Sequence, residues 1–186
     1  LLVEIEADPT TTPVDEDVAL TVAVTNTTDA EIVDVSVELE QEWDAAAGDD
    51  EPELSAVDPT TLSSLAAGAT AEFTATFTGS GPGVSTVTAR AGGDEPIIWW
   101  SPPAGDGPTA AGGAFVSNDA EVEITVVGEL TVNSDGDAAD DDPGDGACDT
   151  GSTVSIEGED VAECTLRAAI QEGNEREGGV EIGFDV

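Results

Sequence analysis

Val18-Ala19-Leu20-Thr21-Val22-Ala23-Val24 places a branched aliphatic residue at every second position, with Ala and Thr between them. Side chains of a strand alternate between its two faces, so this period of two predicts a β-strand with one buried face. The same alternation recurs in Val33-Asp34-Val35-Ser36-Val37-Glu38-Leu39-Glu40, where the odd positions are apolar and the even ones mostly acidic. We therefore expect a sheet with one face in a core and the other in solvent.

The flanking sequence repeats this pattern of short strands and polar turns up to about residue 128. No segment of that region holds a helical period for three turns, which favours an all-β fold. Strands of this length and number are typical of a sandwich of about 100 residues. The candidate strands are Leu2–Ala7, Val18–Thr25, Ile32–Glu40, Ala71–Thr78, Val84–Ala91 and Ala120–Val127, with weaker signals at Leu54–Val57 and Ala114–Ser117.

The charge balance is extreme: 42 acidic side chains face three basic ones, all arginine, for a net charge of −39. Such acidity is common in disordered tails, but 39% of the residues are hydrophobic and fall in alternating runs, which predicts a folded body with an acidic coat. Carboxylates repel over a Debye length of about 30 Å at 0.01 M salt but only about 3 Å at 1 M. The composition is therefore typical of a haloarchaeal protein in near-saturated brine. The alternative is an acidic, calcium-rich surface protein of a moderate-salt organism.

The side-chain inventory excludes several classes of function. Nucleic acids and anionic membranes are excluded as partners, because both require clustered Lys and Arg. The sequence has no His, Lys or Tyr, which rules out a Ser-His-Asp triad, a Schiff-base lysine and a zinc site with His ligands. A glycosidase needs only two carboxylates, but among 42 some pair will always stand at a suitable separation. We expect no enzymatic activity.

Two features indicate an extracellular, cell-surface location. Cys148 and Cys164 form one even pair at short range in a turn-rich segment, which favours a disulfide over a metal site that would lack its other ligands. The sequon Asn26-Thr27-Thr28 predicts a glycan on Asn26. No run of 18 or more apolar residues is present to span a bilayer.

The Pro- and Gly-rich stretch 92–114 contains four consecutive large apolar residues, Ile97-Ile98-Trp99-Trp100. Loops of this length are usually functional or disordered, and these side chains would be costly to leave in water. They either fold back onto the sandwich or form an interface at Trp99 and Trp100, since Trp is enriched in interface hot spots. Both alternatives stay open from the sequence.

Three stretches resemble one known family: DEDVALTVAVTNTTDAEIVDVSVELE (15–40), SSLAAGATAEFTATFTGSGPGVSTVTARAGG (63–93) and SNDAEVEITVV (117–127). They look like the immunoglobulin-like repeats of prokaryotic surface-layer and cell-adhesion-related (CARDB-like) proteins. The family's Leu, Gly and Phe pattern and its Pro-Gly hairpin are matched by Leu65, Gly68, Phe73, Phe77, Pro82 and Gly83. The resemblance implies an immunoglobulin-like β-sandwich over residues 1–128, but it says little about function because many tasks use this fold.

The composition changes after Val127, and residues 133–146 are rich in Asp, with Gly and one Pro as turn formers. The first three acidic or amide side chains here alternate, so one loop can turn three oxygens inward, and later aspartates can complete a calcium shell of about six to eight oxygens. The alternative is that a halophilic chain fills its turns with Asp. The candidate ligands are Asn133, Asp135, Asp137, Asp140, Asp142 and Asp145.

Cys164-Thr165-Leu166-Arg167-Ala168-Ala169, together with Pro143-Gly144-Asp145-Gly146-Ala147-Cys148-Asp149, resembles the Cys-Ser-Leu-Arg-Glu-Ala (CSLREA) leader segment of secreted right-handed β-helix proteins. Thr165 and Ala168 replace the Ser and Glu of that motif. The resemblance implies secretion and a short helix that caps the first coil. The residues themselves predict a helix from about Cys164 to Gly173, with Gly173 as its stop and Leu166, Ala169 and Ile170 on its buried face. A terminal strand, Val180–Val186, follows as a first rung or pairs elsewhere.

These patterns predict two regions, residues 1–128 and 129–186, in a structural module of a secreted haloarchaeal cell-surface protein, filament or surface layer. The alternatives are an adhesin or ligand-binding module, and the non-catalytic part of a larger secreted β-helix protein. The expected partners are copies of itself or other surface proteins, with a possible glycan. In an assembly, Leu1–Ala7 or Gly179–Val186 would add to the sheet edge of a neighbour.

Overall fold

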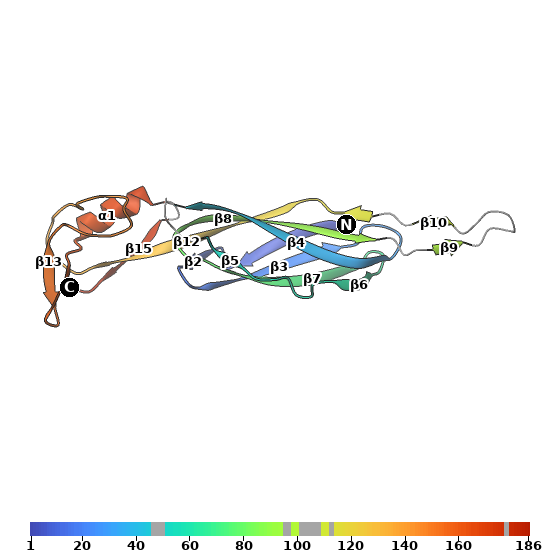
Figure 1. The fold of residues 1–186 in the computed structure, drawn as a ribbon, viewed down its shortest axis with the longest axis horizontal. Helices are drawn as coiled ribbons and strands as arrows, with labels where there is room; N and C mark the ends of the chain where they lie inside the picture. Colours follow the sequence, from blue (N-terminus) through green and yellow to red (C-terminus); the bar gives the residue numbers. More distant parts are fainter. Residues whose placement is uncertain (46–50, 95–97, 101–108, 112–113, 177–178) are drawn as a thin grey trace.

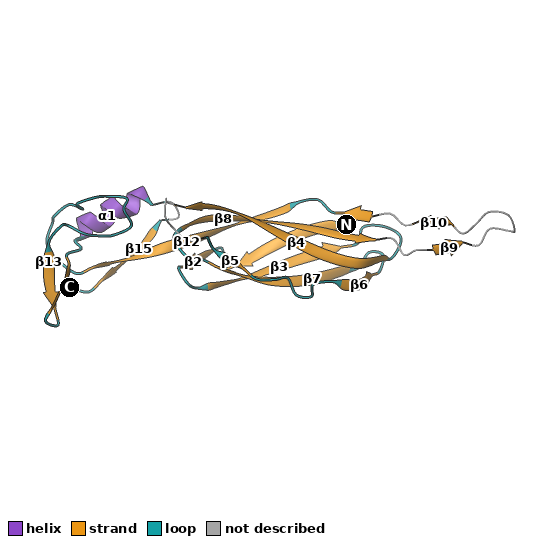
Figure 2. Ribbon diagram, in the orientation of Figure 1, coloured by secondary structure: helices purple, strands orange, loops and turns teal. Residues whose placement is uncertain are grey.

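Two β-sheets packed face to face form most of the molecule, and a small disulfide-closed unit lies at one end (Figure 1). The computed structural model describes residues 1–45, 51–94, 98–100, 109–111, 114–176 and 179–186. The predicted fold class is confirmed, because an all-β, immunoglobulin-like sandwich is followed by a segment with one short helix and a terminal strand. Figure 2 shows this helix beside the end of the sandwich.

The first sheet is antiparallel, and the alternating residues Val18–Val24 lie in one of its two central strands. The alternation predicted there is confirmed, since every second residue from Val18 to Val24 is fully buried. This sheet therefore presents one continuous apolar face to the second sheet. Its strands, in spatial order, are β1 (Leu2–Asp8), β3 (Asp17–Thr25), β7 (Thr70–Thr78) and β5 (Glu53–Leu54).

The second sheet mixes antiparallel and parallel pairs, and one long strand, β12, has partners of both kinds. The chain joins this sheet directly after its first strand. After the cis peptide bond between Asp8 and Pro9 it leaves the first sheet, and the next short strand runs parallel to β12. In spatial order the strands are β15 (Val180–Phe184), β12 (Ala120–Val132), β8 (Gly83–Asp94), β4 (Ile32–Ala45) and β6 (Leu62–Leu65), while β2 (Thr11–Pro13) pairs with β12 and β11 (Ala114–Val116) pairs with β8.

The core lies between the two sheets and is built mainly of Val, with Phe73 and Phe77 of β7 as its largest members. Full burial of one such side chain contributes about 1.5–3 kcal/mol. The strict alternation predicted for 33–40 is interrupted by a register shift between Val33 and Ser36, where Asp34 has a φ of 52°. Because of this bulge, Ile32 joins the core while Val33 is only half-buried.

The Pro82-Gly83 turn does not close a hairpin, so that expectation is wrong. It carries the chain from β7 in the first sheet to β8 in the second, and these strands do not pair with each other. Glycine is required here by close approach, since a Cβ at Gly83 would lie 2.6 Å from the Trp43 ring. Proline and glycine mark a turn reliably, but they do not say whether the flanking strands pair.

The C-terminal unit is continuous with the sandwich through β12. The second half of β12, Gly128–Val132, continues beyond the sandwich and pairs in parallel with Val180–Phe184 of β15. Between them lie a β13–β14 hairpin and a helix that returns the chain in the right direction, as a parallel pair requires. The predicted boundary at residue 128 thus falls inside a strand that both regions share. The elements of this crossover are β13 (Thr153–Ile156), β14 (Glu159–Ala162) and α1 (Leu166–Glu175).

A short two-stranded ladder stands at the opposite end of the sandwich from this unit (Figure 1). β9 (Ile98–Trp100) pairs in antiparallel register with β10 (Thr109–Ala111). The predicted interface at Trp99 and Trp100 depends on side chains that lie outside the described residues.

Candidate functional site

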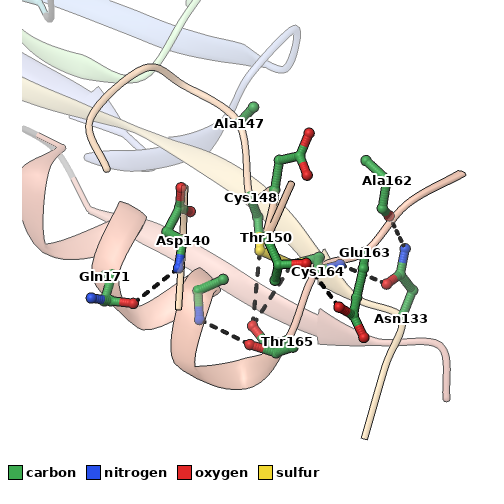
Figure 3. Close-up of a disulfide and its surroundings, with 12 residues drawn as sticks. Asn133, Asp140, Ala147, Cys148, Thr150, Ala162, Glu163, Cys164, Thr165 and Gln171 are labelled. Atoms are coloured by element: carbon green, nitrogen blue, oxygen red, sulfur yellow. Dashed lines mark hydrogen bonds between the residues drawn. A yellow bond between two sulfur atoms is a disulfide. The ribbon is translucent and has the colours of Figure 1, made fainter. Parts of the chain in front are cut away.

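The predicted disulfide is confirmed: Cys148 and Cys164 are bonded, with their Cα atoms 5.2 Å apart. Figure 3 shows the bond at the point where the acidic loop meets the start of α1. Closing a loop of 16 residues stabilises the folded state by about 3 kcal/mol on the chain-entropy model. The cross-link therefore compensates for the small core of this unit.

Thr165 begins the helix. Its Oγ1 accepts a hydrogen bond from the Ala168 amide at 3.1 Å, which satisfies one of the amides that a helix N-terminus leaves free. The same hydroxyl donates to the Ala138 carbonyl at 2.6 Å and so ties the helix to the acidic loop. A Ser at this position would serve equally well, because both residues carry a hydroxyl on Cβ.

Two polar side chains fasten the strand that leads into Cys164. Asn133 accepts from the Cys164 amide and donates to the Ala162 carbonyl, both at 2.8 Å (Figure 3). Glu163 accepts from the hydroxyls of Ser134, at 2.6 Å, and Thr150, at 2.8 Å. These two hydrogen bonds favour the ionised form, so they lower the pKa of Glu163 below its usual value.

Glu172 is the central residue of the unit, and sequence reasoning did not identify it. It is fully buried on α1, and its two carboxylate oxygens accept from the amides of Gly144, at 2.5 Å, and Gly146, at 2.8 Å. Both glycines have positive φ, 97° and 92°, which L-residues rarely adopt. Gly144-Asp145-Gly146 is the sequence signal that could have indicated a buried carboxylate, because such a turn can direct two backbone amides at one anion.

Arg176 neutralises Glu172 and closes the junction with the sandwich. Its Nε lies 3.0 Å from Glu172 Oε1, and its Nη2 donates to the Gly146 carbonyl. A Cβ at Gly128 would lie 2.6 Å from Arg176 Nη1, so the guanidinium fills the space beside the middle of β12. One side chain thus contacts the helix, the acidic loop and the strand shared with the sandwich.

The six predicted calcium ligands do not form one cluster in the described structure, and calcium binding stays a prediction. Among the described residues, no three acidic or cysteine side chains form a cluster that could hold a metal ion. Asn133 fastens the strand described above, and Asp137 forms an ion pair with Arg167 at 2.6 Å. The remaining four separate: Asp135, Asp142 and Asp145 are exposed, whereas Asp140 is buried.

The side chain of Asn26, the predicted glycan site, is fully buried in the fold. Its Nδ2 donates both hydrogens, to the carbonyls of Ala30 at 2.8 Å and Leu65 at 2.9 Å. Its Oδ1 accepts from the Thr28 amide at 2.9 Å. A sugar on Nδ2 would break these bonds, so the Asn-Thr-Thr triplet is a turn motif that joins β3 to β4.

The helix face predicted to be buried is also wrong in part. Ala168, Ala169 and Glu172 face inward, while Leu166 and Ile170 are 44% and 48% exposed. Gly173 lies inside α1 instead of ending it, and a Cβ there would be 2.5 Å from Val180. A small residue is needed because β15 passes directly against the helix at this point.

Leu166 and Ile170 line a groove of about 530 Å³ at the free end of the C-terminal unit. Phe184, the last residue of β15, and Val186 just beyond it also line this groove and are 62% and 78% exposed. We call these four residues the apolar end face. Only two other large apolar side chains are comparably exposed in the described part of the chain, so such residues gather at this place.

The end face lies beside an open strand edge. β15 pairs with β12 on one side, and no described strand pairs with its other side. β1 is also an edge strand, because it pairs only with β3 among the described strands. On its outer edge, however, the Asn118 side chain bonds both the amide and the carbonyl of Val3, at 2.9 and 3.1 Å. Both terminal strands predicted to add to a neighbour are thus edge strands, and β15 is the one that lies beside the apolar end face.

No protein-family model, curated protein or solved structure matches the chain. Within the residues that the structure describes, no helix is long and apolar enough to cross a membrane.

Proposed function

We propose that this chain is a structural module of a secreted, salt-adapted cell-surface protein, and that it assembles through the apolar end face and the open edge of β15. The observation that carries this proposal is the gathering of Leu166, Ile170, Phe184 and Val186 in a chain of net charge −39. An acidic surface keeps a protein soluble and separate, so a local apolar face is the exception that needs a partner.

A further strand, parallel to β15, is the partner whose chemistry fits this place. Its backbone would complete the hydrogen bonds of the open edge, and its alternate apolar side chains would enter the groove. In molar salt the Debye length is about 3 Å, so two acidic modules could approach each other without large repulsion. At high salt, apolar contact between the modules therefore determines whether they associate.

The arginines support a structural module over a binding module for anionic ligands. Each of the three is already paired with carboxylates: Arg90 with Glu40 and Asp119, both at 2.7 Å, Arg167 with Asp137, and Arg176 with Glu172. The pKa of Arg90 is raised, chiefly by its hydrogen bond with Asp119. Each of these cations is therefore already paired with a carboxylate of the same chain, and only Arg176 of the three is mostly buried.

A second candidate is the non-catalytic start of a larger secreted β-helix protein. It is favoured by the parallel register of Gly128–Val132 with Val180–Phe184, joined by a crossover that contains α1. In that arrangement the next coil of the same polypeptide would cover the end face. Both candidates require the same face to be covered, and they differ in the source of the covering strand.

Sedimentation velocity in about 2 M KCl tests the proposed assembly, at an ionic strength where charge repulsion is screened. We expect the wild-type chain to associate as its concentration rises, and Phe184→Ser to weaken this association. Val116→Ser is the matched control, because Val116 is also exposed, at 74%, but lies on β11, outside the end face. A wild-type chain that stays a monodisperse monomer at every concentration contradicts the proposal.

A further inference from the structure

Asp140 is the one described aspartate that the fold buries, with only 8% of its surface exposed. Figure 3 shows it above Gln171 of α1, whose side-chain carbonyl accepts from the Asp140 amide at 3.1 Å. Its Oδ1 accepts from the Asp142 amide at 3.1 Å. Its Oδ2 is buried and has no hydrogen-bond donor in the described chain. An unsatisfied buried polar atom costs about 1–3 kcal/mol, and more if it is charged.

The surroundings of Asp140 carry excess negative charge. Burial raises the pKa of Asp140, and the carboxylates of Glu172 and Asp145 raise it further, while the backbone amides of Asp142 and Asp149 oppose the rise. Glu172 is already satisfied by two amides and by Arg176. Arg176 pairs with Glu172, and no ion pair is present for Asp140 or Asp145 among the described residues, so this region carries excess negative charge.

We propose that one calcium ion binds between the 140–149 loop and α1, with Asp140 Oδ2 as its buried ligand. Two positive charges balance the local excess, and a hard cation prefers carboxylate and carbonyl oxygens. Exposed Asp145 is near enough for its charge to act on Asp140. Calcium takes about six to eight oxygens, often including backbone carbonyls and water, so it does not need a cluster of three acidic side chains.

This site differs from the set predicted from sequence, because Asn133 and Asp137 take no part in it. It also does not rest on the proposed assembly, since Asp140 does not line the apolar end face. Calcium here would join the acidic loop to the helix that carries Leu166 and Ile170. The stability of the C-terminal unit would then depend on the ion.

Thermal unfolding with and without calcium tests the proposal. About 2 M tetramethylammonium chloride supplies the ionic strength without a small competing cation. With calcium at about 100 times its Kd, the wild-type Tm should be about 5 °C or more above the Tm measured in the presence of a chelator. Magnesium should raise it less, because it demands stricter geometry and dehydrates reluctantly. Hydrogen exchange of residues 140–149 should slow in parallel, which locates the effect.

Asp140→Asn and Asp141→Asn are the matched variants, since Asp141 is the exposed neighbour in the same loop. Asp141→Asn should keep the calcium-dependent rise and Asp140→Asn should lose it. Under chelation, Asp140→Asn should melt no lower than the wild type, because it removes an uncompensated buried charge. The proposal is overturned by a wild-type chain that does not respond to calcium, by an equal rise in both variants, or by a chelated Asp140→Asn that melts below the chelated wild type.

Discussion

The sandwich and the C-terminal unit are stabilised by different interactions although they share β12. The sandwich buries two clusters of Val, Phe, Leu and Ile between its sheets. The C-terminal unit has one small cluster, built around Leu130, Val132, Cys164 and Ala169. It compensates with a disulfide, a buried carboxylate that holds two backbone amides, and side-chain clamps from Asn133 and Thr165. A unit too small for a large core needs such cross-links.

This difference predicts that the two regions will respond to different perturbations. Loss of apolar volume should destabilise the sandwich, while reductant, chelator and acid should act on the C-terminal unit. The following experiments test that separation, from the largest expected effect to the smallest.

Phe73→Ala should have the largest effect, because Phe73 is fully buried at the centre of the sandwich. Replacing a buried Phe by Ala costs about 3–5 kcal/mol, through lost burial and the cavity left behind. Urea unfolding in molar KCl measures the free energy of unfolding. Phe184→Ala removes the same group from an exposed position and should change stability by about 0.5 kcal/mol or less. Equal losses in the two variants would show that the sandwich core is not where the structure places it.

Reduction of Cys148–Cys164 should come next and should act on one region only. The chain-entropy model gives about 3 kcal/mol for a loop of this size. Limited proteolysis should then cleave residues 140–164 first and leave the sandwich strands intact. If the reduced protein resists protease over 140–164 as well as the oxidised one, the disulfide does not hold this unit together.

Acid should have the smallest effect, through Glu163. Its folded-state pKa is lowered, chiefly by the Ser134 hydroxyl and then by that of Thr150. A depressed acid pKa adds stability that is present above the unfolded value of about 4.3 and is lost as the pH falls through the folded value. Glu163→Gln should therefore reduce the loss of stability on acidification. Asp140, whose pKa is raised, contributes in the opposite direction, but it does so equally in the wild type and in Glu163→Gln. An unchanged acid profile in Glu163→Gln would therefore contradict the role assigned to Glu163.

The same contrast explains what could be predicted from the sequence. Period-two alternation identified β3 and the buried face of the sandwich, because a sheet between core and solvent imposes that pattern directly. The disulfide followed from the presence of only two cysteines. The helix face did not follow, since Leu166 and Ile170 have core-like spacing but line the end face instead. Glu172 was missed because a buried carboxylate is recognisable only once the two glycine amides that satisfy it are known.

The hydrogen bonds of Asn26 and Asn133 could not be predicted from the sequence for a related reason. Asn26 and Asn133 lie in motifs that suggest chemistry, yet each uses both ends of its amide to fasten backbone. Short polar motifs show which bonds a side chain can form, and the fold decides whether those bonds are made internally. In the C-terminal unit, the side chains of Asn133, Glu163 and Thr165 all form hydrogen bonds within the unit.

Hydrogen exchange of residues 179–186 as a function of protein concentration, in about 2 M KCl, tests the proposed assembly most directly, because screening leaves only short-range contacts. The amides on the outer edge of β15 should be protected at high concentration and exposed at low concentration, while β1, whose outer edge is bonded by Asn118, should not change. Exchange in 179–186 that is independent of concentration, in a sample shown to associate, would mean that the chain assembles through another surface.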